Sequence, residues 1–237
     1  MEIDNILISG RKESIDVCCS LFGYTELLNK LHISARYNIK HQPYEFEKIC
    51  KIFNIDINNT TIPSQKTILI GFSQKYFNEN IIDNYNIERI VTNKDIAKII
   101  GDNISIKYIK CGCISSIIAK EFLNNNIIPS KQSVILLYYG IIYQTSNLKS
   151  KNTKDLDIEM VKYLKEVYKD ILIEDSHNRI FEINNFRDVL YNKLDNNLIK
   201  INNMFENLYI GVICIQTINC KDIIEKNIDL ICDSLER

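Results

Sequence analysis

The chain has 237 residues, a length that suits one large domain or two modest ones. Hydrophobic residues make up 46% of it and charged residues 25%, which is the composition of a globular protein. The net charge is −1 with both signs interspersed, which excludes a strong field that would steer the chain to nucleic acid or an anionic membrane. Isoleucine, asparagine, lysine and tyrosine are abundant, a bias typical of an A/T-rich genome such as that of a parasite or a large DNA virus.

The cysteines and the start of the chain indicate a reducing compartment. No two cysteines form a Cys-x-x-Cys pair, so neither a structural zinc site nor a redox pair is expected. The first residues lead directly into a strand pattern and show no signal-peptide pattern. We therefore expect a cytoplasmic protein with free thiols. The eight cysteines are Cys18, Cys19, Cys50, Cys111, Cys113, Cys214, Cys220 and Cys232.

Strand and helix patterns alternate over the first 110 residues. Strands that alternate with helices form parallel sheets, so we expect an α/β fold whose parallel sheet carries helices on both faces. In such sheets ligands bind beyond the carboxyl ends of the strands, which makes the residues directly after each strand the candidate site. The predicted strands are 5–9, 33–39, 67–70, 87–91 and 104–109, and the predicted helices are 16–31 and 44–53.

The middle of the chain predicts three more helices. A turn of small residues at 111–113 opens the first of them. The second, around 134–142, is apolar on almost every side, as a core helix is, and is too short to span a bilayer. We expect Thr153 to cap the third, with Asp155 and Asp157 in its first turn, where carboxylates suit the helix dipole.

The C-terminal part predicts a second, smaller domain. A helical pattern covers 186–194, a buried strand covers 208–216, and a last helix capped by Asn219 extends through Leu235. The stretch before them is rich in polar residues and resembles an interdomain linker. The expected organisation is therefore a main domain at 1–170, a linker at 171–184 and a small α/β domain at 185–237.

An ordered set of short motifs follows the turn at 111–113. The second helix ends in Gly-Ile-Ile-Tyr-Gln-Thr at 140–145, and Lys149, Ser150, Thr153 and Asp157 come next. This order resembles the DHH phosphoesterases, most of all the manganese-dependent (family II) inorganic pyrophosphatases and their exopolyphosphatase relatives. Those enzymes carry a Cys-Gly-[Ser/Cys] turn, a helix, a buried helix ending in Gly-Ile-Leu-x-Asp-Thr, and then Lys-Ser-x-x-Thr-x-x-Asp.

The resemblance extends to the C-terminal part. The segment 211–219 is similar to the start of the second domain of family II pyrophosphatases. In the family that domain continues and contributes a Ser-Arg-Lys cluster that grips the substrate phosphates. The sequence ends at Arg237, so we expect a truncated second domain without that cluster.

The motifs depart from the family where the family binds its two metal ions. Gly-His-x-Asn-Pro-Asp-x-Asp-Ser after the first strand has become a shorter segment that keeps only Gly10 and Asp16. Asp-His-Asn after the third strand is Gly-Phe-Ser, Asp-His-His after the fourth is Thr-Asn-Lys, and the Asp of Asp-Thr is Gln. The residues that the resemblance places at this degenerate site are Arg11, Asp16, Gly71, Phe72, Thr92, Asn93, Lys94 and Gln144.

These departures remove the ligands that a two-metal site needs. Two divalent ions a few ångströms apart require several bridging carboxylates, and hard ions take carboxylate and imidazole ligands. Asp16 alone remains at a ligand position, while Arg11 and Lys94 would place positive charge beside the cations. The histidines, His32, His41 and His177, occupy none of the ligand positions. The sequence therefore predicts no metal cofactor.

The first functional hypothesis is a catalytically inactive pseudoenzyme, a phosphoesterase scaffold kept as a protein-binding or structural component. A second is an anion-binding module, in which Arg11, Lys12 and Lys94 hold a phosphate or nucleotide without hydrolysing it. Under either hypothesis we expect protein partners of unidentified kind and neither nucleic acid nor membrane. A homodimer stays open, because family II pyrophosphatases often dimerise.

A third hypothesis is a diverged hydrolase. Glu13, Asp16 and Asp95 would hold one magnesium ion, with substrate phosphates completing its coordination. Neither Glu13 nor Asp95 belongs to a pattern that defines such a site.

Overall fold

The computed structural model describes a large part of the chain. The described residues are 6–10, 14–39, 42–58, 66–71, 87–94, 104–169, 180–182, 186, 190, 217 and 220–235. The chain divides into two compact units, Met1–Leu172 and Ile173–Arg237. The larger unit contains every strand described below and all the candidate site residues.

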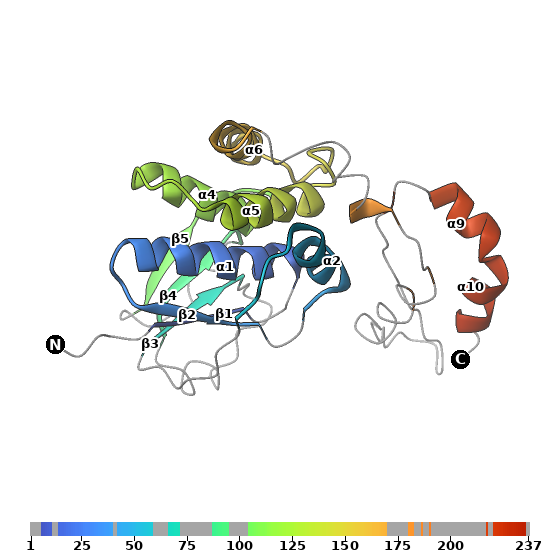
Figure 1. Cartoon of the computed structure of the whole chain (residues 1–237), viewed down its shortest axis with the longest axis horizontal. Helices are drawn as coiled ribbons and strands as arrows, with labels where there is room; N and C mark the ends of the chain where they lie inside the picture. The colour runs from blue at the N-terminus through green and yellow to red at the C-terminus, as the bar shows by residue number, and fades with distance from the viewer. Residues whose placement is uncertain are drawn as a thin grey trace, which may run out of the picture. The chain divides into compact units, whose positions relative to one another are not determined.

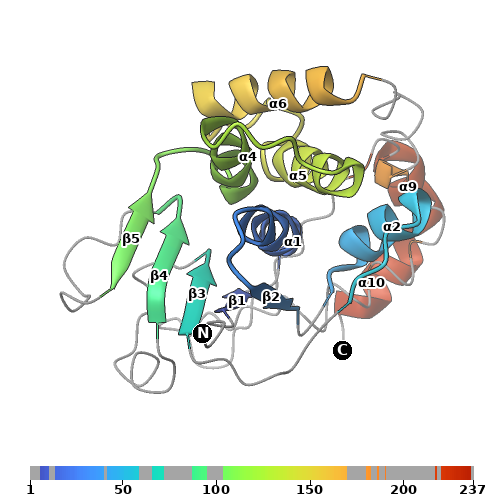
Figure 2. The same cartoon turned by 60° about the vertical axis from the view of Figure 1, so that its left-hand side comes forward.

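Five parallel strands form one sheet in the order β2-β1-β3-β4-β5 (Figure 2). Short runs of Ile, Leu and Val form the central strands, as expected for strands covered on their faces. The predicted α/β fold with a parallel sheet is confirmed. The strands are β1 Ile6–Gly10, β2 Ala35–Asn38, β3 Lys66–Ile70, β4 Ile87–Thr92 and β5 Ser105–Tyr108.

The helices of the larger unit lie in layers on one face of the sheet. Helix α1 lies against the sheet, α4 and α5 lie over α1, and α6 is outermost (Figures 1 and 2). The connections 72–86 and 95–103 lie outside the described residues, so the expectation of helices on the other face is untested. The helices are α1 Ile15–Lys30, α2 Tyr44–Phe53, α4 Ile114–Asn124, α5 Lys131–Gln144 and α6 Asp155–Val167, with α9 Cys220–Lys226 and α10 Ile228–Leu235 in the smaller unit.

Helix α5 is buried at every position from Ser133 to Ile142, as its apolar sequence predicts. This stretch packs against α1, α4 and α6, so none of its sides faces water. The contact with α1 is close at Gly23, where an added Cβ would lie 3.0 Å from Leu137 Cδ2. No helix in the described part of the chain is long and apolar enough to cross a membrane.

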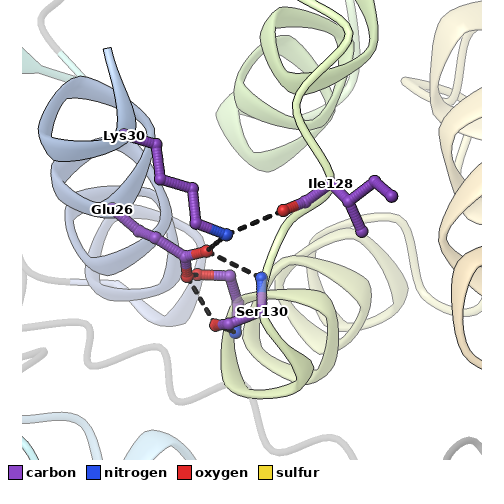
Figure 3. A network of polar contacts seen from close by, with 5 residues as sticks. Glu26, Lys30, Ile128 and Ser130 are labelled. Carbon is purple, nitrogen blue, oxygen red and sulfur yellow. Dashed lines mark hydrogen bonds and ion pairs between the residues drawn. The ribbon is translucent and has the colours of Figure 1, made fainter. Parts of the chain in front are cut away.

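Helix α5 receives its N-terminal cap from two sources. The Ser130 hydroxyl accepts the Ser133 N–H at 3.3 Å, as an N-cap serine does. The carboxylate of Glu26, on α1, accepts the Ser130 N–H at 2.7 Å and the Ser130 hydroxyl at 2.5 Å, and also the Ser133 hydroxyl. Lys30 pairs with Glu26 at 2.7 Å and donates to the Ile128 carbonyl at 2.7 Å (Figure 3).

Two sequence predictions about helix ends are wrong. Thr153 does not cap α6: Lys154 occupies the N-cap position, and the buried Thr153 hydroxyl has no hydrogen-bond partner among the described residues. The Asp157 carboxylate accepts the Lys154 N–H instead, at 2.7 Å. The predicted last helix is two helices, α9 and α10, because the helical geometry is interrupted at Asn227.

The remaining predictions for the C-terminal part are not tested. The strand at 208–216 and the Asn219 cap lie outside the described residues, and the linker at 171–184 and the helix at 186–194 lie largely outside them.

Candidate functional site

The strand order determines where a ligand site is expected. The chain runs from β1 to β2 on one side and continues with β3 on the other, so the order reverses beside β1. In open α/β sheets this switch point, at the carboxyl ends of the strands, is the usual place for ligands. The described candidates near this edge are Asp16, Gly71, Thr92, Asn93, Lys94 and Gln144, whereas Arg11, Lys12, Glu13, Phe72 and Asp95 lie outside the described residues.

Apolar packing closes the carboxyl ends of β1 and β3. A Cβ added at Gly10 would overlap Cγ1 of Val17. Gly71 has a φ of +80°, a conformation that favours glycine, and a Cβ there would lie 2.8 Å from Val17 Cγ2 and 3.3 Å from Ile114 Cδ1. The resemblance assigns the Gly71 position to an aspartate ligand, and a side chain does not fit there unless Val17 moves.

Asp16 is in the first turn of α1 and is directed at the start of α4. Its Oδ2 accepts the Ile114 N–H at 2.8 Å, and its Oδ1 accepts the Ser115 N–H at 2.8 Å and the Ser115 hydroxyl at 2.7 Å. The residue is only 4% exposed. Both carboxylate oxygens are therefore already engaged by α4, and the side chain acts as a cap for that helix.

The environment of Asp16 opposes its charge. Burial raises the pKa of Asp16 above its ordinary value of 3.8, and the hydrogen bonds from Ile114 and Ser115, which lower the pKa, do not compensate for burial. The negative charge of Asp157 raises the pKa further.

Asp157 is a second buried carboxylate, and it holds the turn 111–113 that precedes α4. It accepts the Gly112 N–H at 2.8 Å and the Ser116 hydroxyl at 2.6 Å, besides the Lys154 N–H. The sequence indicated only a favourable helix dipole for Asp157. The bond between Asp157 and the turn 111–113 was not predicted, because Gly112 is 45 residues away in the chain. The one sequence signal that linked Asp157 to Gly112 was that both belong to the motifs of the family resemblance.

The segment after β4 is also committed to internal contacts. Thr92 is fully buried, and its hydroxyl accepts the Lys94 N–H at 3.0 Å. The Asn93 side chain donates to the carbonyls of Cys111 and Gly112, at 3.3 Å and 3.2 Å. Lys94 is exposed. The residues that replace Asp-His-His therefore join the end of β4 to the turn 111–113.

Gln144 is not brought to the carboxylates by any described contact. It is exposed in the last turn of α5, directly before the buried Thr145. Thr145 lies beside the turn 111–113, since a Cβ added at Gly112 would lie 3.2 Å from Thr145 Cγ2. Three residues with positive φ follow and make a short left-handed turn; they are Ser146, Asn147 and Leu148.

The two cysteines of the turn 111–113 are neutral packing groups. Burial, together with the nearby charges of Asp157 and Asp16, raises the pKa of Cys111 to about 12. The Cys113 thiol contacts the Ser116 hydroxyl at 3.0 Å and donates to Asp157 at 3.4 Å, and burial raises its pKa well above 9. Neither thiol has the low pKa of a reactive cysteine, which agrees with the expected packed turn.

The described site residues do not fit a pair of divalent ions. One carboxylate, Asp16, occupies a position that the resemblance assigns to a ligand, and its oxygens are engaged by α4. At Gly71, another such position, an added side chain would meet Val17 and would need an unfavourable positive φ. Within the described part of the chain, no group of three or more His, Cys, Asp or Glu side chains is placed to hold a metal ion.

Comparison with solved structures finds proteins with a similar fold. A Methanococcus jannaschii protein described as a family II inorganic pyrophosphatase superposes with a TM-score of 0.58 and 21% identity, covering 75% of this chain and 60% of that one. An exopolyphosphatase-related protein of Bacteroides fragilis superposes with a TM-score of 0.58 and 12% identity, covering 82% of this chain and 62% of that one.

The chain spans about three fifths of the length of each of these structures. No protein-family model and no curated protein sequence matches it. At these identities the likeness concerns the fold, and the resemblance to the pyrophosphatase and exopolyphosphatase group that the motifs indicated is confirmed at that level. The chain therefore shares its parallel α/β fold with these two proteins.

Proposed function

We propose that this protein is a catalytically inactive relative of the metal-dependent phosphoesterases, retained as a protein-binding or structural component. The observation that carries the proposal is the position of Asp16. This carboxylate stands where the resemblance expects a metal ligand, yet it is buried and accepts three hydrogen bonds from α4.

The neighbouring positions support the same proposal. A ligating side chain at Gly71 would require Val17 to move, and Asn93 is bonded to the turn 111–113. Lys94 is a cation at the end of β4, where repulsion opposes a second positive charge. A fold can persist without its chemistry, because packing and the site are specified by different residues.

The direct test is an assay of pyrophosphate hydrolysis by the full chain in Mn²⁺ and in Mg²⁺, in which the release of orthophosphate is measured. We expect release no faster than in the protein-free blank, and no rise in melting temperature on titration with either metal. Asp16→Asn is the matched variant. Metal-dependent turnover that this substitution abolishes would contradict the proposal, whereas turnover that survives it comes from another site or a contaminant.

The same thermal measurement with inorganic phosphate addresses the anion-binding alternative. A stabilisation by phosphate without turnover, lost in Lys94→Ala and kept in Lys151→Ala, would favour a phosphate-binding module over a purely structural role. Lys151 is a suitable control because it is exposed and is not one of the candidate site residues. We expect phosphate to have the same small effect on both variants and on the natural chain.

The protein-binding part is tested by capture of partners with the full chain as bait. Ile106 and Tyr108 are each 43% exposed on β5, the last strand of the sheet, and are the natural positions to disrupt a protein contact. We expect a specific partner to be lost in the double variant Ile106→Lys, Tyr108→Lys and kept in Asp155→Ala, a substitution at an exposed residue outside β5. Loss in both variants, or in neither, would argue against a partner on this strand.

A further inference from the structure

Helix α4 begins without a cap of its own. Cys113 is at its N-cap position, and the Cys113 side chain makes no capping hydrogen bond. The first N–H groups of a helix have no partner within the helix, and burying them unpaired costs free energy. Ile114 and Ser115 are buried, so water does not replace the missing cap.

Asp16 supplies that cap from a helix 98 residues earlier in the chain. Its two oxygens receive the N–H groups of Ile114 and Ser115 and the Ser115 hydroxyl, all within 2.8 Å. The Ser115 hydroxyl also lies 3.2 Å from the hydroxyl of Ser20, which is one helical turn after Asp16 on α1. These hydrogen-bond donors are neutral, so the attraction comes from oriented N–H dipoles at a helix N-terminus.

The turn 111–113 leads directly into the start of α4, and three other elements hold it. Asn93 joins it to the end of β4, Thr145 packs against it from α5, and Asp157 of α6 accepts the Gly112 N–H. A shift of α4 relative to α1 would therefore be felt at the carboxyl end of β4 and at the ends of α5 and α6.

We propose that Asp16 is a positioning residue, whose carboxylate serves as the missing cap of α4 and fixes α4 on α1 instead of facing a ligand. The proposal goes beyond the proposed function, because it concerns how the ancestral ligand position was reused within the fold. It requires that a pair of acceptor oxygens, rather than a negative charge, is what α4 needs at this point.

The test replaces the carboxylate and then returns it as a free ion. Asp16→Ala removes three heavy atoms, one carbon and two oxygens, which are the heavy atoms of formate. In the full chain we expect Asp16→Ala to lower the melting temperature and to speed hydrogen exchange at the Ile114 and Ser115 amides. Sodium formate should slow that exchange again and raise the melting temperature by about 3 °C at roughly ten times its Kd.

The controls separate a filled cap from a general salt effect. Sodium chloride at equal ionic strength should not protect the two amides, and formate should not stabilise the natural chain. Asp155→Ala is the matched variant, because Asp155 is an exposed aspartate in the first turn of α6. Equal effects of formate on the natural chain, Asp16→Ala and Asp155→Ala would overturn the proposal, as would unchanged exchange at Ile114 and Ser115.

A chain that does not fold with Asp16→Ala still gives an answer. Folding restored by formate alone would support the proposal. If formate does not restore it, Asp16→Asn decides, because asparagine keeps only one of the two acceptor oxygens. Loss of protection at Ile114 or Ser115 supports the cap, and full protection at both overturns the requirement for two acceptor oxygens. No divalent metal or pyrophosphate is present, so this experiment can succeed or fail independently of the proposed function.

Discussion

Two carboxylates on α1 cap two different helices, and they do so in opposite environments. Asp16 caps α4 inside the protein, whereas Glu26 caps α5 near the surface with Lys30 beside it. Burial raises the pKa of Asp16 above 3.8. Burial also acts to raise the pKa of Glu26, but hydrogen bonds from Lys30, Ser130 and Ser133 outweigh it and hold that pKa below 4.5.

The difference teaches what each cap contributes. The charge on Glu26 is favourable in the folded state, because a cation and several donors surround it (Figure 3). The charge on Asp16 is unfavourable, yet removing the side chain leaves buried donors with nothing to bond. Asp16 is therefore needed for its position and hydrogen bonds, and Glu26 also for its charge.

The largest effect is expected for Asp16→Ala. It should lower the free energy of unfolding by about 3 kcal/mol, because two N–H groups and a hydroxyl lose their acceptor in a place that water does not reach. Urea unfolding measures it, with Asp155→Ala as the control. A loss below about 1 kcal/mol would mean that α4 does not depend on this cap.

Glu26→Ala should cost less, about 1.5 kcal/mol. The Glu26 side chain is 17% exposed, so water can reach the groups it leaves, and the Ser130 hydroxyl still caps α5. Glu159→Ala, which removes a more exposed glutamate paired with Lys120, serves as the comparison and should change stability by less than about 0.5 kcal/mol. A Glu26→Ala loss as large as that of Asp16→Ala would remove the contrast between the two caps.

The pH dependence should have opposite signs for the two residues. The folded-state pKa of Glu26 is lowered, so its stabilisation is present above pH 4.5 and is lost as the pH falls through the folded pKa. The folded-state pKa of Asp16 is raised, so its contribution is fully present below pH 3.8 and is lost as the pH rises through the folded pKa.

The sign difference is measured by urea unfolding between about pH 3 and pH 6. As the pH falls, the stability of the natural chain should decline relative to Glu26→Gln and rise relative to Asp16→Asn. Parallel trends for the two variants would show that the environments of the two caps do not differ as described.

Lys30→Met should have the smallest effect, about 0.5 kcal/mol, with the loss reduced at high salt. The Lys30 side chain is 40% exposed, so solvent screens its ion pair with Glu26. The methionine keeps the apolar stem and removes the charge and the bond to the Ile128 carbonyl. A loss above about 1.5 kcal/mol would assign to Lys30 the capping role that we give to Glu26 itself.

Local sequence patterns predicted the elements of the larger unit well. Helix α2 has the predicted ends, Tyr44 and Phe53, and α5 is the buried helix that its apolar sequence indicated. The five strands predicted for the larger unit all appear, with ends that differ by at most two residues. These features depend on the periodicity of neighbouring residues, which is visible in the chain itself.

The same patterns failed at two helix ends. Thr153 has the side chain of a good cap, but the Lys154 N–H is taken by Asp157 and the Thr153 hydroxyl is left buried. In the smaller unit the helical pattern continued past Asn227, where the structure divides it into α9 and α10.

The sequence by itself determined that this chain is a parallel α/β protein with pyrophosphatase-like motifs and few of the family's ligand side chains. Only the tertiary structure decided what the remaining carboxylates do. Asp16 meets its donors 98 and 99 residues later, and Asp157 meets the Gly112 N–H 45 residues earlier. The physical reason is that a carboxylate bonds to whichever donors the packed helices bring to it, and no local pattern records which those are.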